Sequence, residues 1–197
     1  NVKLIVRDDG SNDDTVNILN KYSKDGKLKW YRGENVGPAC SFMTLLRDAP
    51  LSDFYAFSDQ DDYWMPDKLV SAVEKIHDRN TPQLYFSQTQ LANDILQPIS
   101  SIIINPFGTF AESLIYQFVA GCTIVMNESL RNIICLYKPD YIPMHDVWIY
   151  DVALAVGSNV IFDKHSHMLY RQHSKNVIGQ GYGIIEDWRR RVNRILS

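Results

Sequence analysis

Phe54-Tyr55-Ala56-Phe57-Ser58-Asp59-Gln60-Asp61-Asp62 is the stretch that decides the fold of this 197-residue chain. Its first four residues are apolar throughout, which is typical of a strand buried on both faces of a sheet. The acidic run follows at once, so it predicts carboxylates at the carboxyl end of a buried strand. Ligand sites of open α/β sheets lie at that end. The stretch therefore predicts both a sheet flanked by helices and the edge of that sheet where chemistry occurs.

Strand and helix patterns alternate on either side of this stretch. Short apolar runs at residues 2–6 and 28–31 predict strands, and apolar residues at helical spacing predict helices over 39–49 and 67–77. Such alternation is typical of a mostly parallel sheet with crossover helices. Later strands are predicted at 84–90, 119–126, 160–162 and 168–170, and later helices at 128–136, 146–156 and 184–196.

Bulk composition fits one packed domain. The chain has 45% hydrophobic and 22% charged residues, which is enough apolar material for one core and too little length for two large ones. We expect an α/β domain over residues 1–182 and an amphipathic basic helix over 183–197. A net charge of -3 gives no general attraction to nucleic acid.

Cysteine usage and hydropathy indicate the compartment. The three cysteines, Cys40, Cys122 and Cys135, are far apart and odd in number, which favours a reducing environment over a disulfide framework. No apolar run reaches the roughly 20 residues that a membrane span needs. We expect a cytoplasmic protein. The basic helix could contact anionic lipid at the inner face of the membrane, although a solvated helix face is the simpler explanation.

The carboxylates of Asp59, Asp61 and Asp62 predict a cation site. Carboxylates so close in sequence repel one another in a confined site unless a cation or donor groups offset their charge. Oxygen ligands suit Mg²⁺ or Mn²⁺, and such a cation can stabilise a diphosphate as a leaving group. The alternative is a solvated acidic turn before the 67–77 helix, with Asp67 as its cap.

A second acidic turn, Asp8-Asp9-Gly10-Ser11, follows the strand predicted at residues 2–6. It can point a carboxylate at the imide nitrogen of a uracil or thymine base. Turn and capping chemistry explains the same residues equally well. Taken alone, this turn does not distinguish a nucleotide contact from a helix start.

Motifs spread over nearly the whole chain resemble one family. They are Asp8-Asp9-Gly10-Ser11-Asn12-Asp13-Asp14-Thr15, Glu34-Asn35-Val36-Gly37-Pro38-Ala39 and Ser58-Asp59-Gln60-Asp61-Asp62-Tyr63-Trp64-Met65-Pro66-Asp67-Lys68-Leu69. In this order and spacing they resemble glycosyltransferase family 2, whose members transfer sugars from nucleotides and have the GT-A fold, a Rossmann-like α/β fold. The Asp-Gln-Asp-Asp-x-Trp form, His145-Asp146-Val147-Trp148 and residues 170–179 are similar to its bacterial rhamnosyltransferase branch.

The resemblance implies a role for each matching residue. Asp8 and Asp9 would bind the nucleotide of the donor, Asp59 would bind the donor and the metal, and Asp61 would bind the metal. Asp146 matches the acidic position from which the family draws its general base. Chemistry asks for such a residue, because an attacking hydroxyl must give up its proton. A helix cap is the alternative for Asp146.

Further site residues are predicted in the second half of the chain. Arg171 can clamp a diphosphate, and the resemblance suggests His173 as a C-terminal metal ligand. His145 would orient Asp146 or touch the acceptor. Trp148 could stack on a sugar or fill the core.

The chain departs from the family pattern at its start. Family members carry an apolar strand and a helix before the strand at residues 2–6, so we expect the first strand and helix of the GT-A sheet to be missing here. Those elements should help to bind the nucleotide base and should form a central strand.

These expectations converge on an inverting, metal-dependent glycosyltransferase. Its donor would be a dTDP-, UDP- or GDP-sugar, for example dTDP-rhamnose, and its acceptor a hydroxyl of a bacterial cell-surface polysaccharide or a lipid-linked saccharide. A nucleotidyltransferase shares the sheet type and acidic metal site but needs a glycine-rich, basic triphosphate loop, which is not visible. A non-catalytic nucleotide- or carbohydrate-binding domain is a third alternative, and it predicts ligand binding without sugar transfer.

Overall fold

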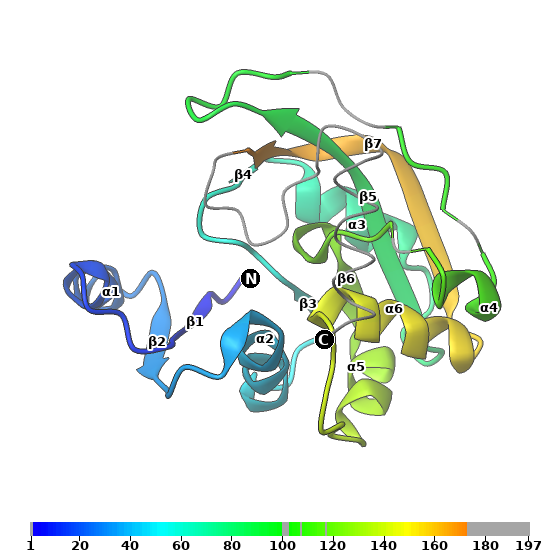
Figure 1. The fold of residues 1–197 in the computed structure, drawn as a ribbon, viewed down its shortest axis with the longest axis horizontal. Helices are drawn as coiled ribbons and strands as arrows, with labels where there is room; N and C mark the ends of the chain where they lie inside the picture. The colour runs from blue at the N-terminus through cyan, green and yellow to red at the C-terminus, as the bar shows by residue number, and fades with distance from the viewer. Residues whose placement is uncertain (1, 100–102, 107, 117, 173–197) are drawn as a thin grey trace, which may run out of the picture.

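The computed structural model describes residues 2–99, 103–106, 108–116 and 118–172, and its strands form two separate sheets (Figure 1). The smaller sheet pairs β1 (Ile5–Asp8) with β2 (Lys29–Arg32) in parallel. The larger sheet has the strand order β3-β6-β5-β7-β4. Its members are β3 (Phe54–Ala56), β4 (Tyr63–Trp64), β5 (Gln83–Ala92), β6 (Val125–Asn127) and β7 (Asn159–Arg171). Among the described residues, no strand pairing joins the two sheets.

The larger sheet is mixed, so the prediction of a mostly parallel sheet is wrong for it. β5 and β7 run parallel, whereas β6 is antiparallel to both β3 and β5, and β4 is antiparallel to β7. β6 and β4 are three and two residues long, and strands so short carry no sequence signal of their direction. β3, β5 and β7 nevertheless share one direction. The acidic loop after β3 therefore lies at the carboxyl edge that these strands share, as predicted.

Helices cover both faces of the larger sheet (Figure 1). Leu84 and Phe86 of β5 pack into the main core with α2, α5 and α6, whereas Tyr85 between them packs against α3. This alternation is the two-residue period of a strand that is buried on both sides. The helices are α1 (Thr15–Lys24), α2 (Gly37–Asp48), α3 (Lys68–Lys75), α4 (Phe110–Ser113), the 3-10 turn η1 (Gly121–Thr123), α5 (Glu128–Cys135) and α6 (His145–Ala155).

α2 connects the smaller sheet to the rest of the molecule. It contacts β1 on one side and α5 and α6 on the other, and Figure 1 shows it between β2 and the larger sheet. Its Met43 and Leu46 are almost fully buried in the main core. The predicted helical spacing at 39–49 is confirmed, and this helix fixes where β1 lies relative to the acidic loop.

Two predicted segments differ in the structure. The strand predicted at 119–126 is the turn η1 followed by β6, and the strands predicted at 160–162 and 168–170 are one continuous strand, β7. The helix predicted at 184–196 lies outside the described residues, as does His173. None of the helices in the described part of the chain has the length and apolarity that crossing a bilayer requires.

Candidate functional site

The acidic loop after β3 is tied to the end of β7 by Arg171. The backbone N–H of Arg171 donates to Asp62 Oδ1 over 3.0 Å, and its Nε donates to the carbonyl oxygen of Asp61 over 2.7 Å. Its Nη1 donates to the carbonyl oxygen of Asp94. Arg171 therefore fixes the backbone of the loop. Its predicted contact with a diphosphate stays a prediction.

Three side chains converge beside this loop. The carboxylates of Asp59 and Asp62 and the thiol of Cys122 place ligand atoms within 4.8 Å of one another. Burial, together with the negative charges of Asp62, Asp61 and Asp146, raises the pKa of Asp59 to about 6. Burial also raises the pKa of Asp62, whose Oδ2 is buried without a hydrogen-bond partner among the described residues. A divalent cation would offset this charge and satisfy that oxygen, so the donor set fits a metal.

The convergent group shares only Asp59 with the predicted metal pair. The sequence pairs Asp59 with Asp61, whereas the structure brings Asp62 and Cys122 next to Asp59. Asp61 lies beside them in the loop, half-buried. Which second carboxylate binds the metal stays a prediction.

Lys68 lies close to this group and is absent from the predicted set. It is the first residue of α3 and is only 2% exposed. Its Nζ donates to the carbonyl oxygen of Cys122 over 2.6 Å and lies 4.5 Å from the centre of the Trp64 ring. Burial lowers the pKa of Lys68 to about 8, against the opposing effect of the Asp62 and Asp59 carboxylates. The sequence signal was its spacing, because Lys68 shares a helix face with Ala72 and Ile76.

Tyr170 of β7 is a second such neighbour. Burial raises the pKa of its phenol, and the negative charges of Asp59, Asp62 and Asp61 act in the same direction. Its place at the site follows from the pairing of β7 with β5. This pairing joins distant segments, so the local sequence around Tyr170 does not predict it.

Asp146, the predicted base, lies in the same site. It is the second residue of α6, and its Oδ2 accepts the backbone N–H of Gly121 over 3.1 Å. Its Oδ1 accepts the N–H of Val147 over 2.8 Å. Asp146 is near enough to Asp59 to influence its pKa. The structure therefore brings the predicted base and the acidic group together, with the turn η1 between them.

His145 is buried in the core next to η1. Its ring centroid lies 4.3 Å from that of Phe42 and 5.0 Å from that of Phe57. Burial lowers its pKa to about 4, and both ring nitrogens are buried without a partner among the described residues. A side chain on Gly121 would overlap the imidazole. The predicted contact between His145 and an acceptor would require this ring to become exposed.

Trp148, the other predicted acceptor residue, is half-buried against the main core. Its ring centroid lies 6.2 Å from that of Tyr137. The structure thus provides the packing role that the sequence left open, and contact with a sugar stays a prediction.

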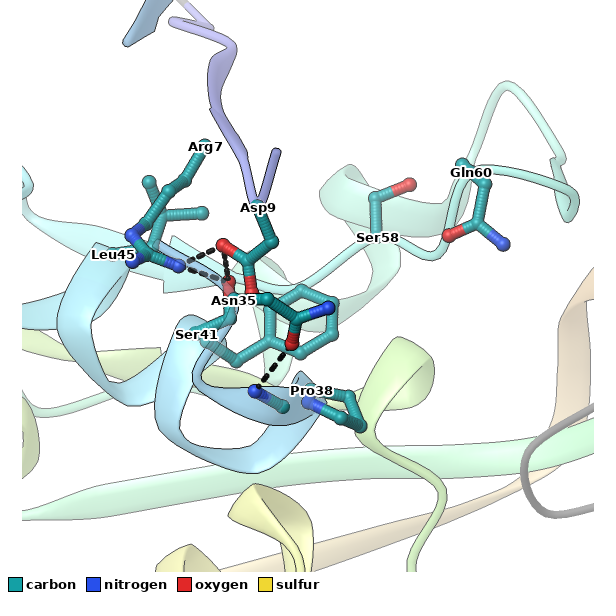
Figure 2. Close-up of a pocket in the computed structure, with 10 residues that line it drawn as sticks. Arg7, Asp9, Asn35, Pro38, Ser41, Leu45, Ser58 and Gln60 are labelled. Carbon is teal, nitrogen blue, oxygen red and sulfur yellow. Dashed lines mark hydrogen bonds and ion pairs between the residues drawn. The ribbon is translucent and has the colours of Figure 1, made fainter. Parts of the chain in front are cut away.

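A cavity of about 350 Å³ joins the two acidic turns (Figure 2). Asp9 lines it and is held by an ion pair with Arg7 and by the hydroxyl of Ser41, which donates over 3.0 Å. Figure 2 shows Ser58 and Gln60 of the second turn across the cavity from these residues. The cavity therefore extends from the end of β1 to the acidic loop, where a nucleotide is predicted to bind.

Asp8 does not line this cavity. It is buried at the end of β1, where it accepts the backbone N–H of Ser11 over 3.1 Å, and Arg32 Nε lies 3.5 Å from its other oxygen. Hydrogen bonds from the side chain and the backbone of Ser11 keep the pKa of Asp8 below its usual value. Asp8 thus stabilises the turn that presents Asp9, and its contact with a base stays a prediction.

Comparisons with known proteins identify a family and a fold. The family model described as Glycosyl transferase family 2 matches residues 1–133. The chain is 26% identical over 209 residues to the dTDP-rhamnosyl transferase RfbG of Shigella flexneri, covering 90% of this chain and 65% of that protein. It is 27% identical over 145 residues to UDP-Glc:alpha-D-GlcNAc-diphosphoundecaprenol beta-1,3-glucosyltransferase WfaP of Escherichia coli, covering 72% of this chain and 56% of that protein.

A solved structure shares the fold. The mannosyltransferase PcManGT from Pyrobaculum calidifontis, in complex with GDP-Man and Mn²⁺, superposes with a TM-score of 0.63 at 16% identity. The match covers 98% of this chain and 52% of that one. The chain thus spans about half to two thirds of the length of these three proteins.

Proposed function

The chain belongs to glycosyltransferase family 2, and on this premise we propose that it is an inverting, metal-dependent glycosyltransferase that acts on a nucleotide sugar. One observation carries the proposal: the short turn η1 contacts Asp146 through the N–H of Gly121, and its Cys122 lies beside the carboxylates of Asp59 and Asp62. Displacement at an anomeric carbon needs a base for the incoming hydroxyl and positive charge for the departing diphosphate. This arrangement supports both needs.

In this proposal each residue of the site has a separate role in the reaction. Asp146 would take the proton of the acceptor hydroxyl, and its hydrogen bonds from the backbone of Gly121 and Val147 hold the carboxylate in one orientation. Asp9 and the cavity beside it would bind the nucleotide, and Arg171 would keep the acidic loop in place.

A metal fits the same site. Asp59, together with Asp61 or Asp62, would hold Mg²⁺ or Mn²⁺. When bound, the ion supplies positive charge that stabilises the leaving diphosphate. The Asp62 Oδ2 atom, which is buried without a hydrogen-bond partner among the described residues, supports this assignment, and His173 stays a predicted further ligand.

The donor and acceptor are proposed from the relatives. RfbG is a dTDP-rhamnosyl transferase by name, so we propose dTDP-rhamnose as the first donor to test. The names of WfaP and PcManGT make UDP-glucose and GDP-mannose the next ones. WfaP acts on a diphosphoundecaprenol-linked sugar, which supports a lipid-linked or polysaccharide acceptor hydroxyl here.

The test is a screen of dTDP-rhamnose, UDP-glucose and GDP-mannose with Mg²⁺ or Mn²⁺, scored for transfer, donor hydrolysis and thermal stabilisation. Asp146→Asn is expected to lower turnover by about 100-fold or more while the nucleotide still binds. Asp59→Asn is expected to abolish the metal-dependent stabilisation. Asp140→Asn, at an exposed position, is the matched control and should behave like the wild type.

Two outcomes would contradict the proposal. Binding without transfer by the wild type would favour a non-catalytic domain. If transfer occurs, the anomeric configuration of the product is read by NMR. A product that keeps the configuration of the donor would contradict inversion.

A further inference from the structure

Among the described residues, Lys68 is the most buried charged residue outside the proposed roles. Its residue is 2% exposed, and its Nζ lies against the carbonyl oxygen of Cys122, the sulfur of Met168 at 3.5 Å and the ring of Trp64. Lysines are almost never buried so fully unless paired. Within the described part of the chain, no carboxylate lies within ion-pair distance of this ammonium. Its strong contact is therefore the backbone of one turn.

That turn, η1, touches both halves of the proposed site. Its Gly121 N–H donates to Asp146, and the thiol of Cys122 lies beside Asp59 and Asp62. Lys68 donates a hydrogen bond to the same turn, at the carbonyl oxygen of Cys122. The turn is thus held by α3 from one side and by α6 from the other.

Packing alone does not account for a charge at this position. A methionine of similar length would fill the same space without the cost of taking an ammonium out of water. The charged end must therefore contribute something that an apolar chain cannot, and its one short hydrogen bond goes to η1.

We propose that Lys68 is a positioning residue for sugar transfer, which holds η1 so that Asp146 keeps its place relative to the carboxylates of Asp59 and Asp62. This inference rests on the proposed function. Lys68 touches neither substrate nor metal in it. It acts through the carbonyl of Cys122.

The test compares Lys68→Met with Lys75→Met in the full protein with Mn²⁺ and the donor that the wild type uses. Lys68→Met is expected to keep or raise the melting temperature while kcat falls about 10-fold or more and KM for the donor changes less than about threefold. Lys75 lies on the same helix but pairs with Asp163, so Lys75→Met should show the opposite pattern of lower stability and unchanged kcat. An unchanged kcat in Lys68→Met would overturn the proposal.

A double-mutant cycle tests the route through Asp146. If Lys68 acts by placing Asp146, then Lys68→Met should cost less than about twofold when Asp146 is already asparagine. If the losses in kcat from the two single substitutions multiply in the double variant, Lys68 does not act through Asp146.

Should Lys68→Met not fold, Lys68→Arg is the second variant. It keeps the charge but moves the donor, and it should lower kcat with unchanged Mn²⁺ binding. A wild type that transfers no sugar would refute the proposed function, whereas an active wild type with an equally active Lys68→Met would refute only this inference.

Discussion

Gly33 lies against the guanidinium of Arg7 so closely that a methyl group on Gly33 would overlap it. The Arg7 side chain is almost fully buried and cannot move aside easily, because Asp9, Ser41 and the carbonyl oxygen of Glu34 all hold it. The glycine therefore allows Arg7 to hold Asp9 at the cavity.

Gly33→Ala is expected to weaken nucleotide binding more than it weakens the fold. The added methyl should displace Arg7 and with it Asp9, raising the Kd for the donor nucleotide about 10-fold and lowering the free energy of unfolding by about 1–3 kcal/mol. Calorimetric titration with dTDP, UDP and GDP, alongside urea denaturation, measures both. Gly108→Ala, where a side chain meets open space, is the matched control, and equal effects of the two variants would contradict the role of Gly33.

Arg171→Ala is expected to loosen the acidic loop. The change removes hydrogen bonds to the carbonyl oxygens of Asp61 and Asp94, which should cost about 2 kcal/mol of unfolding free energy. It should also lower kcat/KM about 10-fold or more through misplacement of the carboxylates. The control is Arg79→Ala, because Arg79 is largely exposed and its contacts are an ion pair with the exposed Asp53 and the ring of Phe54, away from the acidic loop. A variant that keeps full transfer would show that the loop does not need this anchor.

The segment from β3 to α3 was predictable because local rules govern it. An apolar run, an acidic turn and a helical spacing follow one another, and the family implied by these motifs is confirmed by the family model. The direction of β6 was not predictable, because this three-residue strand is oriented by its partners β3 and β5.

Distant contacts hid other site residues. A lysine is usually a surface residue, and two of the contacts that bury Lys68 come from Cys122 and Met168, which are 54 and 100 positions away in sequence. The sequence likewise predicts His145 as a polar site residue, whereas in the structure its ring packs against Phe42 and Phe57.

The stability of the protein is expected to fall in acid because of His145. Its pKa is about 4 in the folded state and about 6.5 when unfolded. As the pH falls below 6.5 the unfolded chain binds this proton first, so the folded state loses about 3 kcal/mol by pH 4. Denaturation at several pH values should show a shallower loss in His145→Gln. His77→Gln, at an exposed histidine, should keep the wild-type slope, and an identical slope in His145→Gln would contradict the assignment.

Cys122 is expected to make the site sensitive to thiophilic metals. Its thiol lies among the carboxylates of Asp59 and Asp62, and Zn²⁺ binds thiolates far better than Mg²⁺ does. Zn²⁺ should therefore inhibit Mn²⁺-supported transfer, and Cys122→Ser should raise the inhibitory concentration about 10-fold. Cys40→Ser, at an exposed cysteine, should not. If Zn²⁺ inhibits the wild type, Cys122→Ser and Cys40→Ser equally, the inhibiting ion does not bind at Cys122.

β1 and β2 form a ribbon of two strands that shares no hydrogen-bonded edge with the larger sheet in the described residues. Such a ribbon has little stability of its own, so its amides should exchange with deuterium long before those of β5, whose residues are nearly all buried. Asp8 at the end of β1 and Asp9 just after it are therefore expected to lie on a part of the molecule that opens before β5 does. A nucleotide bound between Asp9 and the acidic loop is expected to slow exchange in β1 specifically, because ligand binding would stabilise the β1 side of the donor site.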